Sequence, residues 1–273
     1  MAKAFSILVW NVEHFGATDK YKKKPKKPIQ PIVDEIADVN ADIVAIIEVR
    51  SNIVAAALMQ AMPNYFFFIT EGEQMQEILV GIRKTLPAFI TQKNEFQAGQ
   101  SSLRPGLLVT LVVDETPYHL LFLHVKSMPD PRGFGIRNYM TTKAFDFRKV
   151  LEKAIGSKPN YIFLGDLNTM GMNYPGRDKL ISGDREIQEL DSAAKRRGMR
   201  VLTKSYENTY WSEKYGESNL DHVVAVNHLK FKKFGDDDVR VTGWNEQTTK
   251  AKRKSWVKKY SDHAMLYLEV QKV

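Results

Sequence analysis

The segment Ile162–Thr169 (IFLGDLNT) places a carboxylate and a carboxamide two residues apart. It begins inside a short apolar run, Tyr161–Leu164, that is typical of a strand, and it ends in Gly-Asp-Leu-Asn. Alternate side chains on an extended backbone point to the same side. Asp166 and Asn168 would therefore offer two oxygen ligands, or would position a nucleophile. Asp, Gly and Asn also dominate ordinary turns, and these residues alone favour a turn.

Polar side chains recur at the ends of other apolar runs. One such placement carries little information, since Glu48, for example, could simply pair with nearby Arg50. Six placements are hard to attribute to chance, because each has a desolvation cost unless the groups gather around a metal ion or a phosphate. The residues concerned are Asn11, Glu48, His124, Asp166 with Asn168, Asp221, and Asp262 with His263.

The hydrophobic pattern predicts the elements that must position these groups. The runs over 65–70, 78–83 and 86–90 favour a meander, and 92–106 and 129–135 are predicted as loops. Helices are expected over 31–39, 53–62, 138–155 and 184–197, with Asp184 as the N-cap of the last. The remaining predicted strands are 4–11, 41–47, 107–113, 118–125, 161–164, 223–226 and 264–270.

Strand runs interrupted by a few helices predict an α+β fold. We expect two packed, mostly antiparallel β-sheets in a four-layer α/β/β/α sandwich, with helices on the outer faces. The chain has 273 residues, 43% of them hydrophobic, and it contains no linker, low-complexity tract or repeat of solenoid period. A single catalytic domain over residues 1–273 is expected.

The absence of cysteine excludes disulfides and thiolate metal sites. The N-terminal run is interrupted by Asn11 and Glu13 too early for a signal peptide, and no apolar run approaches the length of a membrane span. A cytoplasmic protein without a membrane segment is expected.

Two segments carry the positive charge. Lys20–Lys27 and Lys250–Lys259 each hold six basic residues and no acid. Without these twelve, the 40 basic residues fall to 28 against 32 acidic ones, so the rest of the chain has a net charge of −4 instead of +8. Solvated charge is one interpretation. The other is an electrostatic surface that binds a polyanion.

Taken together, these motifs resemble the endonuclease/exonuclease/phosphatase superfamily, which has the DNase I-like fold. Their order and spacing cover residues 5–270 and are specific as a set, although each motif alone would be weak. The matching motifs are Trp10-Asn11, the strand ending in Glu48, HVKS at His124, GDLN at Gly165–Asn168, LDH at Asp221 and SDH at Ser261–His263.

The resemblance implies hydrolysis of a phosphoester by in-line attack of water, with Mg²⁺ or Mn²⁺ as cofactor. Hard oxygen ligands suit these ions. Glu48 is the implied main metal ligand, with Asn11 and Asp262 as further ligands. Asp166 would orient or deprotonate the attacking water, and Asn168 would hydrogen-bond the phosphate.

The resemblance also implies roles for two imidazoles. His263, held by Asp221, would act as a general base or stabilise the charge of the transition state, since a carboxylate fixes the imidazole tautomer and favours its charged form. His124 would contact the phosphate or act as a general acid. Abasic-site endonucleases carry a tyrosine near this position, so a specialised repair activity is less favoured. The family's arginine on the following helix would be Arg148 rather than Arg137, whereas His222 is expected to be structural.

The two basic segments follow Asn11 and precede Asp262, so we expect both on the catalytic face. Aromatic residues interleaved with the second segment would allow base stacking. The function predicted is a metal-dependent nuclease, with DNA favoured over RNA. A phosphohydrolase of inositol phosphates or phospholipid head groups and a non-catalytic nucleic-acid-binding protein are the alternatives. The expected substrate contacts are Arg148, Lys126, Lys22, Lys23, Lys24, Lys252, Arg253, Lys254 and Trp256.

Overall fold

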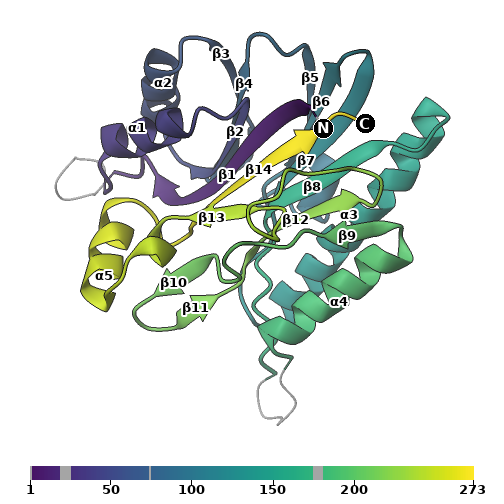
Figure 1. The fold of residues 1–273 in the computed structure, drawn as a ribbon. Coiled ribbons are helices and arrows are strands. Elements are labelled where there is room, and N and C mark those ends of the chain that lie inside the picture. Colours follow the sequence, from purple (N-terminus) through teal and green to yellow (C-terminus); the bar gives the residue numbers. More distant parts are fainter. Residues whose placement is uncertain (1, 19–25, 74, 175–180) are drawn as a thin grey trace.

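The computed structural model describes residues 2–18, 26–73, 75–174 and 181–273. Within these ranges, two six-stranded sheets pack face to face, and helices cover their outer sides (Figure 1). Each sheet contains one parallel pair of strands, and its other neighbouring strands are antiparallel. The predicted α+β sandwich of two mostly antiparallel sheets is confirmed.

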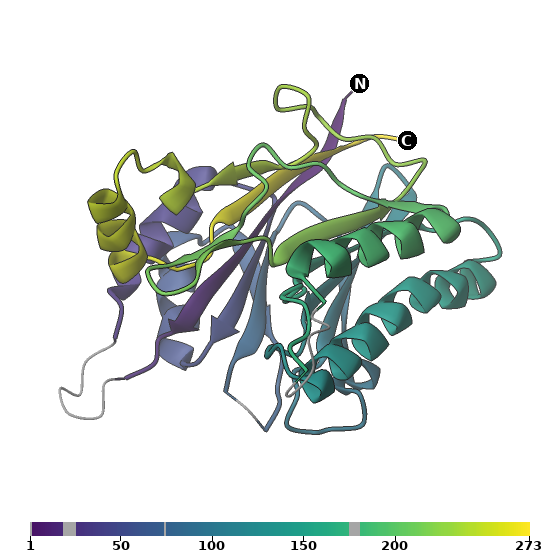
Figure 2. The same ribbon diagram turned by 90° about the horizontal axis from the view of Figure 1, so that it is seen from below.

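The first sheet combines the beginning and the end of the chain. Strand β1 is parallel to β2 on one side and antiparallel to β14 on the other. The main-chain N–H of Lys272 donates to the carbonyl oxygen of Ala2 over 2.9 Å, and the two termini lie close together (Figure 2). In spatial order the strands are β13 (Arg240–Thr242), β14 (Met265–Gln271), β1 (Lys3–Phe15), β2 (Ile43–Val49), β4 (Glu77–Arg83) and β3 (Tyr65–Ile69).

The second sheet comes from the middle of the chain, with β7 and β8 as its parallel pair. A separate short hairpin, β10 (Tyr210–Ser212) and β11 (Gly216–Ser218), precedes the strand β12. In spatial order the strands of the second sheet are β5 (Ala88–Lys93), β6 (Gly106–Val113), β7 (Thr116–His124), β8 (Asn160–Asp166), β12 (Asp221–Val226) and β9 (Met199–Val201).

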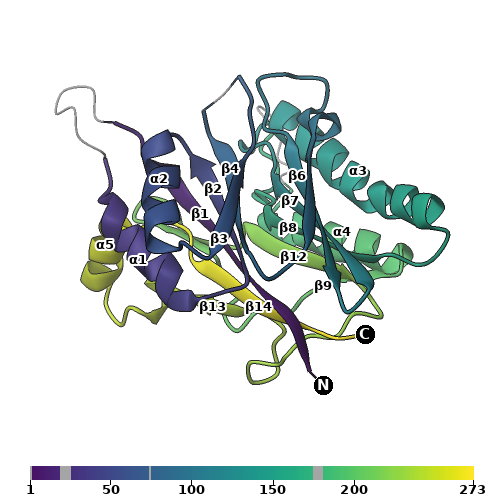
Figure 3. The same cartoon turned by 90° about the horizontal axis from the view of Figure 1, so that it is seen from above.

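The helices form the two outer layers (Figure 3). Helices α1 (Ile29–Val39) and α2 (Asn52–Ala61) cover the first sheet, and α3 (Pro131–Ile155) and α4 (Gly183–Arg196) cover the second. Helix α5 (Lys250–Lys259) lies beside α1, before β14. Two short 3₁₀ helices, η1 (Asn94–Gln97) and η2 (Trp244–Glu246), complete the described elements.

The packing of strand β2 explains why its residues form a continuous apolar run. Val44 and Ile46 pack in the cluster formed with α1 and α2, whereas Ile43, Ala45 and Ile47 pack in the cluster that includes the second sheet. Alternate side chains of a strand point to opposite faces. A strand covered on both faces must therefore be apolar at every position until it reaches the site.

Several element boundaries differ from the sequence prediction, among them those of β1, α3 and α4. Strand β1 runs to Phe15, so Asn11 lies within the strand and not at its end. Helix α3 begins at Pro131 because the carboxylate of Asp130 accepts hydrogen bonds from the first turn, so part of the predicted loop 129–135 is helical. The N-cap of α4 is Ser182 and not Asp184, because the Ser182 hydroxyl accepts the N–H of Arg185.

The predicted meander over 65–90 is also wrong. Strands β3 and β4 pair with each other, but β5 pairs with β6 in the other sheet. The chain therefore crosses between sheets after Arg83, and no periodicity in the sequence marks that crossing.

Candidate active site

Five strands deliver polar side chains to one end of the sandwich. In the second sheet, His124 on β7 and Asp221 on β12 are both register partners of Asp166 on β8. In the first sheet, Asn11 lies beside the last residues of β2, where Glu48 is found. Each parallel pair, β1–β2 and β7–β8, directs its carboxyl-terminal ends to this face. The structure therefore brings these five predicted residues together.

Asp166 lies at the centre of the group. Its Oδ2 accepts a hydrogen bond from the Asn11 side-chain amide at 2.9 Å, and its Oδ1 accepts the main-chain N–H of Asn168 at 3.0 Å. The Nε2 atoms of His124 and His263 lie 3.7 and 4.0 Å from Asp166 Oδ2. A carboxylate, two amides and two imidazoles thus surround one small volume.

The GDLN motif depends on its glycine. Gly165 has φ +134°, and a Cβ atom there would lie 2.1 Å from the carbonyl oxygen of Leu123 on the neighbouring strand. Only a residue without a side chain allows β8 to approach β7 so closely. Asn168 follows in a left-handed conformation, with φ 49°, and its side-chain amide donates to the carbonyl oxygen of Val125. These contacts fix the loop that carries Asp166.

His263 and Asp221 form a buried ion pair, with 2.8 Å between Nδ1 and Oδ2. Burial alone would lower the pKa of His263, but the carboxylates of Asp221 and Asp166 raise it well above its usual value. Burial and the neighbouring Asp221 carboxylate raise the pKa of Asp166 to about 7. The arrangement favours a charged imidazolium beside Asp166.

Glu48 occupies a strained position at the end of β2. Its φ of 66° is unusual for a residue with a side chain. Its Oε2 accepts hydrogen bonds from the His14 main-chain N–H and the Gln76 amide, both at 3.0 Å, and lies 2.8 Å from His14 Nδ1. Burial would raise the pKa of Glu48, but the hydrogen bonds and charge of His14 hold it well below its usual value. Glu48 is therefore an anion at neutral pH.

The donor set fits a hard divalent cation. The Oδ1 atom of Asn11 is buried and has no hydrogen-bond partner among the described residues, which leaves it free to ligate a metal next to Glu48. Asp262 is half-buried, and burial raises the pKa of its carboxyl group, an effect to which the Glu48 carboxylate adds. A second group of potential ligand atoms, from Asp166, Asp221 and His263, lies within 4.8 Å of one another.

The SDH segment is bonded directly to β1. The Ser261 hydroxyl donates to the carbonyl oxygen of Asn11 over 2.6 Å, and the Trp10 indole N–H donates to the carbonyl oxygen of His263 over 2.9 Å. These bonds place His263 and Asp262 opposite the residues that β1 carries. The tryptophan and the serine of the two motifs are therefore structural supports.

Arg104 was not recognised in the sequence. It belongs to the polar stretch between η1 and β6, is only 8% exposed, and its Nε has no partner among the described residues. Burial lowers its pKa, and the nearby carboxylates of Glu48, Asp166 and Glu77 oppose that effect. Burial together with the Arg104 charge lowers the pKa of His124 to about 3, so this imidazole is neutral.

Three further residues line the candidate site without a signal in the sequence. His14 and Gln76 contact Glu48, and the ring of Tyr210 packs edge-on against the His263 ring with 5.2 Å between centroids. His222, by contrast, has the structural position expected of it. Its Nε2 lies 2.7 Å from the Thr169 hydroxyl in a buried polar cluster behind the site.

The arginine of α3 that faces the site loops is Arg137. It is 1% exposed, forms two 3.0 Å contacts with Glu186, and donates to the carbonyl oxygens of Met128 and Gly171 at 2.7 Å each. It thereby ties together the loops that follow His124 and Asn168. The choice of Arg148 as a substrate contact does not fit its position.

Arg148 lies near the opposite end of the second sheet. It forms a helical ion pair with Glu152 at 3.4 Å, and its charge acts on His228, which contacts Asn160 at the start of β8. The choice of Arg148 was based on the amphipathic pattern of α3. That pattern reflects how the helix packs and carries no information about the position of the site.

The second basic segment forms α5, and some of its basic side chains form ion pairs with other parts of the protein. Arg253 pairs with Glu217 at 2.5 Å, Lys254 pairs with Glu213 at 2.7 Å, and Lys252 is exposed. Trp256 packs against the rings of Trp10 and Tyr260 and is half-buried, so the expectation that it stacks on a base is not supported.

Two remaining predictions concern lysines. Lys126 is half-buried, two residues beyond His124, and its charge acts on Asp130 at the start of α3. The predicted contacts of the first basic segment, Lys22, Lys23 and Lys24, lie outside the described residues.

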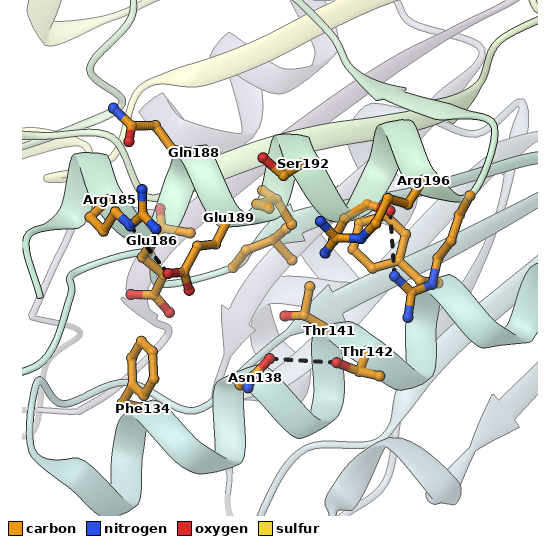
Figure 4. A pocket seen from close by; sticks show the side chains of 16 residues that line it. Phe134, Asn138, Thr141, Thr142, Arg185, Glu186, Gln188, Glu189, Ser192 and Arg196 are labelled. Atoms are coloured by element: carbon orange, nitrogen blue, oxygen red, sulfur yellow. Dashed lines mark hydrogen bonds and ion pairs between the residues drawn. The ribbon is translucent and has the colours of Figure 1, made fainter.

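A groove of about 370 Å³ lies between α3 and α4, behind the catalytic loop (Figure 4). Asn138, Thr141 and Ser192 line it, and Leu167 and Thr169 form part of its wall. The side chains of the candidate site do not line this groove: Asn11, Glu48, His124, Asp166, Asp221 and His263 all lie outside it. The candidate chemistry therefore belongs to the end of the sheets and not to the groove.

Comparison with known proteins places this chain in a family. The sequence profile of the Endonuclease/Exonuclease/phosphatase family matches residues 8–263. The chain belongs to this family, and the resemblance inferred from the motifs is confirmed.

Solved structures with the same fold include two TDP2 proteins. Truncated Caenorhabditis elegans TDP2 has a TM-score of 0.67 and 16% identity, with 98% of each chain covered. D. rerio TDP2 complexed with single strand DNA product has a TM-score of 0.61 and 14% identity, over 98% of this chain and 99% of the other. An endonuclease/exonuclease/phosphatase from Bacteroides vulgatus has a TM-score of 0.64 and 11% identity, with 98% of each chain covered. At these identities the likeness establishes the fold.

No curated protein sequence matches the chain. Among the described residues, no helix is both long and apolar enough to span a membrane.

Proposed function

We propose that the protein is a metal-dependent phosphodiesterase that hydrolyses nucleic acid, with DNA as the favoured substrate and RNA as the alternative, by in-line attack of water. One observation carries the proposal. Glu48, Asn11, Asp166, His124 and the Asp221–His263 pair converge from both sheets on one small volume. Because both sheets contribute, residues 1–273 would act as a single catalytic domain.

In this proposal, Glu48, Asn11 and Asp262 would hold Mg²⁺ or Mn²⁺. Metal ligands must be deprotonated, and Glu48 meets this condition because its pKa is held low. His263 meets it poorly, because Asp221 favours the protonated imidazole. The group formed by Asp166, Asp221 and His263 is therefore better explained as an ion pair with a neighbouring carboxylate than as the metal site. When bound, the metal would supply Lewis-acid stabilisation of the phosphate.

The protein's own side chains would divide the remaining work. Asp166, with a pKa raised to about 7, would orient the attacking water and accept its proton. The His263 imidazolium would stabilise negative charge on the phosphate oxygens, a role that its raised pKa favours over that of general base. Neutral His124 and the Asn168 side chain would hydrogen-bond the phosphate.

The positive groups near this volume support a polyanionic substrate. Arg104 is buried near the carboxylates, and Lys126 lies two residues beyond His124. The neighbour D. rerio TDP2 carries a single strand DNA product, which favours nucleic acid over an inositol phosphate. No described helix could span a membrane.

A substrate panel tests the proposal. Labelled duplex DNA, single-stranded DNA, RNA and inositol phosphates are incubated with Mg²⁺, Mn²⁺ or a chelator. We expect cleavage of DNA only when a metal is present, and loss of cleavage in the double variant Glu48→Gln/His263→Ala. Turnover of inositol phosphates alone would contradict the proposed substrate, and an unchanged double variant would contradict the proposed site.

A further inference from the structure

The two members of the Asp221–His263 pair come from different sheets. Asp221 begins β12 of the second sheet, whereas His263 precedes β14 of the first. Their 2.8 Å contact therefore depends on how the two sheets are held together at this end. A displacement of about 1 Å is enough to lower a catalytic rate by about 10²-fold.

Thr209 forms hydrogen bonds on both sides of the junction between the two sheets, one side being the main chain of Asp221 and the other the main chain next to His263. Its Oγ1 accepts the main-chain N–H groups of Asp221 at 2.9 Å and of Leu220 at 3.1 Å. Its carbonyl oxygen accepts the N–H of Ala264, the residue after His263, at 2.7 Å. The residue is 0% exposed. A hydroxyl has two acceptor lone pairs, and the main chain around Asp221 uses both.

The neighbours of Thr209 strengthen the junction. The Tyr210 ring packs against the His263 ring, and the Trp211 N–H donates to the carbonyl oxygen of Asp262 over 2.9 Å. On the other side, the Lys204 ammonium donates to the carbonyl oxygen of Asp221 over 2.8 Å. The main chain of Asp221 is thus held at its N–H by Thr209 and at its carbonyl by Lys204.

We propose that Thr209 is a positioning residue that sets the geometry of the Asp221–His263 pair. Its expected effect on rate rests on the proposed function, but its effect on the pair does not. Thr209→Val keeps the shape of the side chain and removes the acceptor of two buried N–H groups. Buried N–H groups without a partner are costly, so the turn before β12 shifts and Asp221 moves away from His263. Thr209→Ser retains the hydroxyl and the geometry.

A kinetic comparison tests this with a matched control. Ser6 is also a buried residue, 1% exposed, whose hydroxyl accepts a main-chain N–H, that of Asp42 at 3.0 Å, near the start of β1. We expect Thr209→Val to lower kcat about 10-fold or more with KM within about twofold. Thr209→Ser restores kcat. Ser6→Ala lowers the melting temperature but leaves kcat unchanged, whereas an equal loss of kcat in Ser6→Ala would overturn the proposal.

A spectroscopic measurement tests the geometry without any substrate. The chain has six histidines, so ¹⁵N-histidine labelling gives few signals, and those of His263 are assigned by their absence in His263→Gln. At one fixed pH, we expect the His263 Nδ1 resonance to shift in Thr209→Val and to stay in place in Thr209→Ser and Ser6→Ala. If the wild-type protein hydrolyses no nucleic acid, the proposed function fails while this measurement still decides the role of Thr209. An unmoved resonance in Thr209→Val overturns that role.

Discussion

The side-chain amide of Asn11 donates to Asp166 Oδ2 over 2.9 Å, although 155 positions separate the two residues in the chain. The bond joins the first sheet to the second at the centre of the candidate site. It orients the Asn11 amide and leaves its Oδ1 without a partner among the described residues, on the strand that pairs with the end of β2 where Glu48 is found. One hydrogen bond therefore links the proposed metal ligands to the proposed water-orienting carboxylate.

Replacing Glu48 tests the metal site. Glu48→Gln keeps the size of the side chain but removes the charge that the His14 contacts stabilise. We expect kcat/KM for DNA cleavage to fall by at least about 10²-fold, equivalent to about 2.7 kcal/mol of barrier. The concentration of Mn²⁺ at half-maximal binding, measured by calorimetry, should rise in parallel.

The control for this change is Glu152→Gln, which alters the same chemical group on α3, near the opposite end of the second sheet. Its activity and Mn²⁺ affinity should match those of the wild-type protein. Wild-type Mn²⁺ affinity in Glu48→Gln would show that the cation binds elsewhere.

The raised pKa of Asp166 predicts how stability varies with pH. A carboxyl group whose folded pKa lies above its unfolded value binds more protons when folded, so its contribution to stability is present at low pH and is lost as pH rises through the folded pKa. For Asp166 this interval runs from its ordinary value of 3.8 to about 7. The metal-free wild-type protein should therefore lose stability relative to Asp166→Asn over this interval, by up to about 1.4 kcal/mol per pH unit.

Urea unfolding of both proteins at several pH values, in the presence of a chelator, measures this difference. Parallel stability curves for the two proteins between pH 4 and about 7 would show that Asp166 titrates normally.

The two arginines of α3 should behave differently. Arg137→Met breaks a buried ion pair and leaves the Glu186 carboxylate without its partner, which costs about 3–5 kcal/mol. Arg148→Met removes a half-buried arginine whose ion pair with Glu152 lies within one helix, and should change stability by no more than about 1 kcal/mol. Urea unfolding distinguishes the two, and equal losses would refute the assignment of Arg137 as the arginine that holds the site loops.

Gly165 and Gly156 give a matched test of the GDLN motif. Both have positive φ, but a Cβ at Gly165 would lie 2.1 Å from a backbone oxygen, whereas nothing lies within 4 Å of a Cβ at Gly156. Gly156→Ala should cost about 1 kcal/mol for the left-handed conformation alone. Gly165→Ala should cost about 3 kcal/mol or more and should also lower activity, because the main chain that carries Asp166 must move. Similar melting temperatures for the two variants would contradict the close approach of β7 and β8.

Much of the candidate site could be predicted because its residues interrupt apolar strands. Glu48, His124 and Asp166 stand out against buried neighbours, and this contrast is visible in the sequence alone. The pairing of Asp221 with His263 was implied by the family resemblance and not by this contrast, and the structure brings the two side chains to 2.8 Å. Polar residues at the end of a strand can be recognised because the strand itself has a clear hydrophobic pattern.

Arg104 and Thr209 could not be predicted in this way. Each lies in an irregular segment, where burial has no period and where Arg and Thr are ordinary surface residues. The contacts that bury them come from distant parts of the chain, such as Glu48 for Arg104 and Ala264 for Thr209. The expectation that Trp256 stacks on a base is not supported for a different reason. Its basic neighbours in the sequence suggested contact with a nucleic acid, whereas in the structure its ring packs against Trp10.

The bond between the Trp10 indole and the carbonyl oxygen of His263 spans 253 positions, and it has a consequence for biosynthesis. Protein chains emerge from the ribosome N-terminus first. A nascent chain that already holds Asn11, Glu48 and Asp166 still lacks β14, and β1 keeps an unpaired edge until β14 arrives. The imidazole of His263 enters the site at the same step. Completion of the first sheet and completion of the proposed catalytic site are therefore one event.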